Sequence, residues 1–320
     1  MTGGTGLPPT AGVPLRLRGR VLAPDRAAVM AVVNRTPDSF YPAARAGDED
    51  AALAAVARAV ADGADLVDIG GVRAGRGAEV GVEEEIDRVL PVVRRVRAAF
   101  PDLPISVDTW RAEVAEAVTA AGADLVNDTW AGHDPALAHV AAAAGAGLVC
   151  SHTGGLPPRT DPLRPQYVPA PEPDADADPD AGAEADPLDG VLVDVLATLA
   201  AAAARAVRAG VDPGSVLVDP THDFGKTTWH SLHLTRRTPD LVALGFPVLM
   251  ALSRKDFVGE SLGLPVDERL EGTLAATAVA AWLGASVFRA HDVRATRRTV
   301  EMVAVLRGDR PPVRAVRGLV

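Results

Sequence analysis

Polar side chains follow eight short apolar runs of the sequence, and each polar group begins where a run ends. In chain order the groups are Asn34; Gly70, Gly71 and Arg73; Asp108 and Thr109; Asn127 and Asp128; Ser151 and His152; Asp219 to Lys226; Ser253, Arg254 and Lys255; and Arg289, His291 and Asp292. Carboxylates and amides match the donors and acceptors of a planar ligand, whereas guanidinium and ammonium groups bind carboxylates and phosphates. If the fold gathers these groups, they predict a site for a small anionic molecule.

The rare polar residues of the chain fall within the same groups. Arginine supplies almost all of the 32 basic residues, and the only lysines are Lys226 and Lys255. The only asparagines are Asn34 and Asn127. In a sequence this rich in Arg and Ala, a Lys or Asn indicates a position where Arg or Asp cannot do the same chemistry. All four are therefore candidate functional residues.

The eight apolar runs have the length and spacing of parallel strands that alternate with helices. The predicted strands are 28–33, 65–69, 104–107, 124–126, 147–150, 215–218, 247–251 and 286–288. The predicted helices are 49–62, 82–98, 111–121, 134–144, 188–209, 229–243, 268–283 and 293–306. Eight such units predict a single α/β domain, a (β/α)₈ TIM barrel over residues 27–308, whose strand ends surround one mouth; an open doubly wound sheet is the alternative.

Three segments fall outside this pattern. Residues 1–26 are rich in Gly, Pro and Arg and are predicted to form a flexible N-terminal tail, and residues 309–320 a C-terminal tail. Residues 156–187 combine many prolines with seven acidic residues after position 170. Such a composition cannot bury enough apolar area to order itself, so we predict a disordered insertion after the fifth strand; a lid over the mouth is the alternative.

Composition limits the classes of partner and the cellular location that we expect for the protein. The net charge is −10 at pH 7 and no basic stripe stands out, which argues against nucleic acid. No run of 18 apolar residues without a charge occurs, and the N-terminus lacks the apolar core of a secretory signal. We therefore expect a cytoplasmic protein with no membrane contact. The single cysteine, Cys150, excludes an internal disulfide and a CxxC zinc site, and we expect it to be a core thiol.

Several of the candidate residues also have structural explanations. Asp108 and Asn127 could be N-caps of the helices that follow them. Arg254 and Lys255 could form a solvated surface pair, and His152 and His291 could bond backbone carbonyls near the rim. These explanations fit single residues, but they do not account for polar groups at every strand end.

The motifs within these groups resemble a known family. The segments NRTPDSF (34–40), SVDT (106–109), ND (127–128), DP (219–220), FGKT (224–227), SRK (253–255), ERLEGTLAATA (268–278) and R-x-HDV (289–293) resemble dihydropteroate synthase in order and spacing. That enzyme of folate synthesis joins a dihydropterin methyl diphosphate to p-aminobenzoate. The resemblance covers about residues 28–300 and implies a (β/α)₈ barrel, a homodimer and Mg²⁺ as cofactor.

The resemblance also assigns roles to individual residues. Asp219 would accept two hydrogen bonds from the pterin, Asp108 and Asn127 would read its other edges, and Phe224 and Lys255 would contact its ring. Asn34 would orient the diphosphate and its Mg²⁺, and Arg289 and His291 would bind the diphosphate as it leaves. Ser253 and Arg254 would hold the second substrate. Catalysis would then depend on Asn34, Lys255, Arg289 and His291.

Departures from the family pattern concentrate in a few loops. After the second strand, the family's hydroxyl and arginine positions are Ala74 and Gly75, unless Arg73 or Arg76 restores the cation. Tyr41 to Ala44 replace a glycine-rich stretch of the first loop. After the sixth strand the family's Gly-x-Gly becomes Thr221, His222 and Asp223, in which the last two could be an acid/base pair or could bond each other structurally.

These departures leave three functions open. The sequence favours a dihydropteroate synthase-like transferase with weak or lost activity. The alternatives are a paralogue that binds pterin or diphosphate without synthase chemistry, or a pterin-dependent methyltransferase domain. A barrel that serves only binding or regulation would keep the fold and lose the chemistry.

Overall fold

The computed structural model describes residues 12–34, 42–73, 75, 77–160, 167 and 188–317, with only the backbone of Asn34 and of residues 42–48. The expectations for Tyr41, Ala74 and Arg76, for the side chain of Asn34 and for most of the insertion at 156–187 therefore lie outside the described residues.

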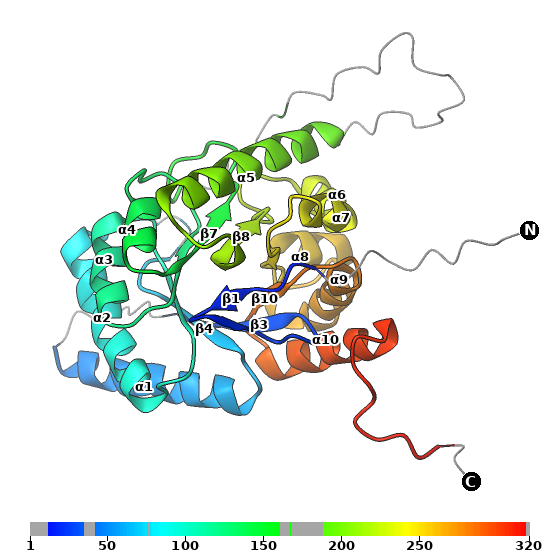
Figure 1. Cartoon of the computed structure of the whole chain (residues 1–320), viewed down its shortest axis with the longest axis horizontal. Helices are drawn as coiled ribbons and strands as arrows, with labels where there is room; N and C mark the ends of the chain where they lie inside the picture. Colours follow the sequence, from blue (N-terminus) through cyan, green and yellow to red (C-terminus); the bar gives the residue numbers. More distant parts are fainter. Residues whose placement is uncertain are drawn as a thin grey trace, which may run out of the picture.

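Eight parallel strands form a closed barrel (Figure 1). They are β3 (Ala28–Asn34), β4 (Leu66–Gly70), β5 (Ile105–Asp108), β6 (Leu125–Asp128), β7 (Gly147–Ser151), β8 (Val216–Asp219), β9 (Leu249–Met250) and β10 (Val287–Ala290). The sheet runs from β8 through β3 to β10 and β9, and a parallel bridge between Val218 and Val248 joins its two edges. The predicted barrel is confirmed, and the open sheet is wrong.

Helices cover the outside of the barrel. They are α1 (Pro42–Ala61), α2 (Val82–Ala99), α3 (Ala112–Ala120), α4 (Leu137–Ala143), α5 (Asp189–Ala209), α6 (Thr228–Arg236), α7 (Thr238–Val242), α8 (Asp256–Leu262), α9 (Leu270–Trp282) and α10 (Val293–Arg307). The single helix predicted over 229–243 is two, because Pro239, the second residue of α7, lacks the N–H that would continue the hydrogen bonding of α6. The seven-residue α8 was not predicted, since it is too short to show a helical period.

A short hairpin closes the amino-terminal end of the barrel, so the prediction of a flexible tail is wrong for residues 12–26, the described part of 1–26. Its strands are β1 (Arg16–Leu17) and β2 (Arg20–Val21), and Gly19 between them has a φ of 71°. Leu15 and Leu17 are buried against Met30 and the first residues of other strands. Two-residue strands are too short for a periodic pattern, so only their burial reveals them.

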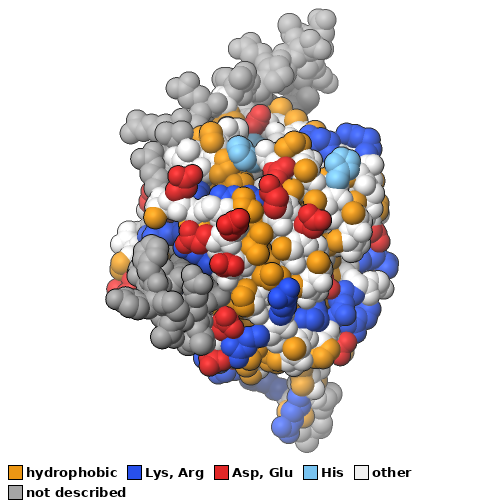
Figure 2. Space-filling view, turned by 90° about the vertical axis from the view of Figure 1, so that its left-hand side faces the viewer, with side chains coloured by type: hydrophobic (Ala, Val, Ile, Leu, Met, Phe, Trp, Pro, Cys, Tyr) orange, Lys and Arg blue, Asp and Glu red, His pale blue; other side chains and the backbone are white. Residues whose placement is uncertain are grey.

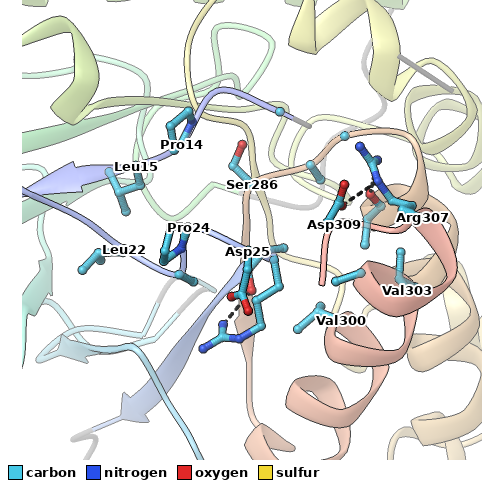
Figure 3. A pocket seen from close by; sticks show the side chains of 18 residues that line it. Pro14, Leu15, Leu22, Pro24, Asp25, Ser286, Val300, Val303, Arg307 and Asp309 are labelled. Carbon is cyan, nitrogen blue, oxygen red and sulfur yellow. Dashed lines mark hydrogen bonds and ion pairs between the residues drawn. The ribbon is translucent and has the colours of Figure 1, made fainter. Parts of the chain in front are cut away.

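A cavity of about 210 Å³ lies between this hairpin and the end of α10 (Figure 3). Pro14, Leu22 and Val300 contribute apolar side chains, and Arg307 pairs with Asp309 at 3.0 Å on its edge. The helix ends before Gly308, and residues 309–317 form no helix or strand. The cavity is at the opposite end of the barrel from the carboxyl ends of the strands.

Two surface features bear on the predicted partners. Among the described residues, α5 is the one helix long and apolar enough to cross a membrane, and it packs on β7 and β8 as a core helix does. On the face in Figure 2, acidic side chains gather in the upper half and basic ones form separate groups. That face therefore carries no continuous basic stripe.

Candidate functional site

An ion-pair network lies at the carboxyl ends of three strands. The guanidinium of Arg289, on β10, donates from Nε to Asp68 at 2.7 Å and from Nη2 to Asp108 at 3.1 Å. Asp68 belongs to β4 and Asp108 to β5, so the contacts bridge residues up to 221 positions apart. Nη1 of Arg289 has no hydrogen-bond partner among the described residues, and the side chain is 22% exposed. This nitrogen is free to bind an anion at the mouth.

Asp68 is the centre of this network, and the sequence prediction missed it as a site residue. It is fully buried and also accepts bonds from Ser106 Oγ at 2.6 Å and Asn127 Nδ2 at 3.1 Å. A signal was present, because Asp68 is a carboxylate inside an apolar strand, and buried charges are rare unless they are paired. Asp68 thereby fixes the orientations of both Asn127 and Arg289.

The carboxyl of Asp108 has an environment that favours its neutral form. It accepts a bond from Thr129 Oγ1 at 2.9 Å besides that of Arg289. Burial raises its pKa to about 7, although Arg289 opposes the shift. Burial also disfavours the charge of Arg289, but Asp68 and Asp108 outweigh it and raise the pKa of the guanidinium. The N-cap explanation is wrong for Asp108 and Asn127, whose side chains bond within this network.

Asp219 ends β8 in a second part of the site. It is 5% exposed and accepts a bond from the backbone N–H of Thr221 at 2.7 Å. Burial raises its pKa, and the positive charges of Lys255, Lys226 and Arg289 oppose that shift. These interactions place Asp219 near the cations of three different strands and loops.

Phe224 and Lys255 form an aromatic and cationic wall beside Asp219. The Lys255 ammonium lies 4.3 Å from the centre of the Phe224 ring and donates to the carbonyl of His222 at 2.5 Å. Trp130, in the loop after β6, meets the same ring edge to face at 5.6 Å between centroids. A flat heteroaromatic ligand could stack in such a setting while its polar edge bonds carboxylates.

The other lysine, Lys226, is buried and supports the loop after β8 from within. Its Nζ donates to the carbonyls of His152 at 2.8 Å, Phe224 at 3.0 Å and Thr221 at 3.2 Å. Nζ also contacts His152 Nδ1 at 2.9 Å, and His152 Nε2 lies 2.7 Å from Asp194. Burial lowers the pKa of Lys226 to about 7 and that of His152 to about 4. The sequence marks Lys226 as a candidate functional residue. In the structure its ammonium group bonds three backbone carbonyls and so supports the fold of the loop.

His222 and Asp223 do not bond each other. His222 is fully buried and shares a hydrogen bond of 3.1 Å with Thr235 Oγ1. Asp223 accepts bonds from the backbone N–H groups of Asp256 at 2.6 Å and Phe257 at 3.3 Å, which begin α8. The acid/base pair and the mutual structural bond are therefore both wrong. His222 bonds α6, whereas Asp223 bonds the start of α8 and also Ser231 of α6.

The two residues expected to hold the second substrate, Ser253 and Arg254, lie in different surroundings. Ser253 Oγ lies 3.1 Å from Nδ1 of the exposed His291, so these two strand ends meet at the rim. Arg254 instead holds Asp292 through Nε at 2.8 Å and the carbonyl of Asp267 through Nη1 at 2.8 Å. Its guanidinium is thus committed to neighbouring backbone and to one carboxylate, and it is not a solvated surface pair with Lys255.

The loop after β4 is held by an arginine from a distant loop. Arg159, beyond β7, donates to the carbonyls of Gly75 at 3.2 Å and Ala78 at 2.7 Å. Tyr167 reaches the other way, because its hydroxyl donates to Gly225 O at 2.5 Å in the loop after β8. The described residues of this segment thus connect loops on either side of the mouth.

A metal would depend on few protein ligands. No cluster of three or more His, Cys, Asp or Glu suited to a metal occurs in the described part of the chain. The backbone of Asn34 pairs with Gly70, so this residue ends β3 beside the strand that carries Asp68. One amide oxygen beside phosphate oxygens is a set that Mg²⁺ accepts, since it commonly binds few protein groups plus substrate phosphates.

Buried carboxylates, an asparagine, an aromatic ring and two cations lie at the mouth of this TIM barrel, and their chemistry suits a heteroaromatic anion. A family model described as pterin binding enzyme matches residues 30–291. The chain belongs to this pterin-binding enzyme family, within its dihydropteroate synthase branch.

Two relatives and one solved structure locate the chain within that branch. It is 56% identical over 303 residues to a Mycobacterium leprae protein named inactive dihydropteroate synthase 2, covering 95% of this chain and 98% of the relative. It is 35% identical over 281 residues to the dihydropteroate synthase of Bacillus subtilis, covering 87% and 88%. The structure of the Xanthomonas albilineans enzyme in complex with 7,8-dihydropteroate superposes with a TM-score of 0.72 at 36% identity, covering 92% and 98%.

Proposed function

We propose that this protein binds a dihydropterin methyl diphosphate and condenses it with p-aminobenzoate weakly or not at all. The observation that carries the proposal is the position of Arg289, which Asp68 and Asp108 hold while Nη1 remains open to an anion. Asp219 and Lys255 are close enough for their charges to interact, and we assign both to the binding of the pterin ring.

Each group has a distinct part in this binding. Asp219 accepts hydrogen bonds from the amino-pyrimidinone edge, and Asn127 and Asp108 read the remaining edges. Lys255 contacts the ring over Phe224, and Arg289 with His291 binds the diphosphate. Asn34 holds Mg²⁺ together with diphosphate oxygens, and the metal supplies charge neutralisation when it is bound. Ser253 lies at the second-substrate side.

Weak condensation follows from the loop after β4. In the synthases this loop carries a hydroxyl and an arginine where this chain has Ala74 and Gly75. The 56% identical relative named as inactive supports the same conclusion for this chain. A pterin-dependent methyltransferase is less favoured, because it would have no use for the open guanidinium of Arg289.

A titration and a product assay test the proposal. Isothermal titration with the pterin diphosphate and Mg²⁺ should give one site per chain, and diphosphate release with p-aminobenzoate should be far slower than in an active synthase. An absence of pterin binding at millimolar concentration contradicts the proposal. Release at the rate of an active synthase contradicts the second half of it alone.

We further propose that the protein is cytoplasmic and forms a homodimer through α9 and α10, which pack side by side. Val279 and Trp282 of α9 are 49% and 39% exposed, and Met302 and Leu306 of α10 are 55% and 62% exposed. Exposed apolar residues on two neighbouring helices are typical of subunit contacts. Light scattering should give the mass of a dimer, and Met302→Lys should shift it toward the monomer; a monomeric wild-type protein contradicts this.

A further inference from the structure

A cavity of about 590 Å³ lies outside the barrel, between β7 and the helices α4 and α5. Leu148 and Cys150 of β7 and Leu137 of α4 form its apolar floor, and they face the helix layer. The cavity exists because α4 has only seven residues and α5 presents alanines such as Ala202 on this side. Its volume lies within the range of small-molecule pockets, which is roughly 300–1,000 Å³.

Charged side chains of both signs line the cavity, and the two arginines among them are exposed to solvent. Arg205 and Arg208 lie three residues apart on α5, and neither side chain has a hydrogen bond or ion pair within the described part of the chain. The carboxylate of Asp128 is bonded by the backbone N–H groups of Trp130 at 3.0 Å and Gly132 at 2.6 Å. The carboxylate of Asp134 is bonded likewise by Ala112 at 2.8 Å and Ala136 at 2.9 Å. Backbone groups therefore hold both carboxylates in place, whereas the two arginine side chains have hydrogen-bonding capacity left for a ligand.

We propose that this cavity is a second binding site, for an organic anion with an apolar body, such as an aryl or alkyl carboxylate or sulfonate. The charged group of the ligand pairs with Arg205 and Arg208, since guanidinium groups bind such oxyanions with two parallel hydrogen bonds. Its apolar body covers Leu137, Leu148 and Cys150. The site is separate from the pterin mouth and does not depend on the proposed function.

The loop after β6, residues 128–132, separates this cavity from the mouth of the barrel. On the barrel side, Thr129 bonds Asp108 at 2.9 Å and Trp130 contacts Phe224. On the cavity side, Ala131 and Gly132 line the second site. A ligand in the cavity therefore touches the same five-residue loop that supports the pterin groups.

The first test titrates the protein with 8-anilinonaphthalene-1-sulfonate, a fluorescent aromatic sulfonate. Wild-type protein should bind one probe saturably, and the double variant R205A/R208A should bind it at least tenfold more weakly. The control R94A/R298A removes two other exposed helix arginines, neither of which forms a hydrogen bond or ion pair with the described residues, and should bind as the wild type does. Equal affinity of both double variants overturns the proposal, as does the absence of saturable binding.

The second test fills the cavity. Ala202→Leu adds a side chain to the cavity wall and should weaken probe binding at least tenfold, whereas Ala201→Leu on the exposed side of the same helix should not. If the Ala202→Leu variant does not fold, the arginine variants of the first test still show whether the probe binds in this cavity. Binding that Asp219→Asn weakens, and that the arginine variants leave unchanged, locates the probe in the barrel mouth and overturns the proposal.

Discussion

The strand ends of the barrel and the loop after β4, residues 71–80, differ in how their polar groups are held. Asp68 is fully buried and bonds partners from β5, β6 and β10. Gly75 and Ala78 in the loop are held instead through their carbonyls by one side chain, Arg159. A residue in a strand end cannot change without disturbing several neighbours, whereas a loop residue can change almost alone. The difference explains how the proposed pterin-binding groups could persist while the loop after β4 departed from the family pattern.

Restoring the family's residues at positions 74 and 75 of this loop should recover condensation. The double substitution Ala74→Thr, Gly75→Arg should raise diphosphate release with p-aminobenzoate by roughly 30- to 2000-fold, from one neutral and one charged hydrogen bond worth together about 2–4.5 kcal/mol. A Cβ at Gly75 would have Arg73 Nε as its nearest neighbour, at 3.7 Å, so the site has room. Gly81→Arg adds the same charge nearby in open space and should change nothing. An unchanged rate in the restored loop would mean that the loss lies elsewhere.

The strand-end network can be broken at its centre. Asp68→Asn should lower the free energy of unfolding by about 3 kcal/mol, because removal of one partner from a buried pair leaves the other uncompensated. Urea denaturation measures this. The control is Asp102→Asn, whose side chain is 91% exposed in a surface pair with Arg20, and which should cost less than about 1 kcal/mol. Equal effects would show that Asp68 adds no special stability.

Asp219 tests the pterin side of the mouth. Asp219→Asn keeps the shape of the side chain but replaces a charged acceptor, and should weaken binding of the pterin diphosphate by about 100-fold, or ~3 kcal/mol. Isothermal titration gives the affinity. Asp102→Asn serves again as the control. Equal affinities of the two variants would contradict the proposed role of Asp219.

The burial of Asp108 predicts a pH dependence. Its pKa is about 7 in the folded protein, so the ionised carboxylate that accepts hydrogen bonds is lost as the pH falls below 7. Pterin affinity should then decline by up to tenfold per pH unit between about pH 7 and 5, and Asp108→Asn should flatten the profile. The stability of the unliganded protein should move oppositely. Because the folded pKa lies above the unfolded value of about 4, this stabilising contribution is present below pH 4 and lost as the pH rises toward 7.

The smallest effect is expected at the bridge between loops. Arg159→Ala removes the two bonds to Gly75 and Ala78, and amide exchange of residues 77–80 should become several-fold faster in hydrogen–deuterium exchange mass spectrometry. Exchange in β4 should be unaffected. Arg94→Ala, an exposed helix arginine, is the control, and unchanged exchange in the loop would show that other contacts hold it.

Much of the barrel could be predicted because its strands are buried, short and regularly spaced. All eight predicted strands overlap the strands observed, since each contains a short apolar run such as 125–126 or 216–218. The hairpin at Arg16–Val21 and the helix at Asp256–Leu262 could not be predicted, because each is shorter than the period that would reveal it.

The sequence predicts where the site residues lie in the barrel, but not which side chains or backbone groups they bond. Asp108, Asn127, Asp219 and Arg289 do converge, because parallel strands end at one rim. The commitment of Arg254 to Asp292 and of Asp223 to α8 could not be foreseen, since both depend on which loop packs against which. Asp68 could not be identified by position, because it lies inside an apolar strand and the candidate residues are those that follow the strand ends.

The hairpin that closes the barrel has a consequence for synthesis on the ribosome. Its Leu15 and Leu17 are made well before Leu249 and Val287 of the last two strands, with which they share one buried cluster. The carbonyl of Val13 accepts a bond from Ser286 Oγ at 2.7 Å, across 273 positions of sequence. The hairpin must therefore wait, unpacked, until nearly the whole chain has emerged. Contacts this distant slow folding, and they make this hairpin the last part of the barrel to be secured.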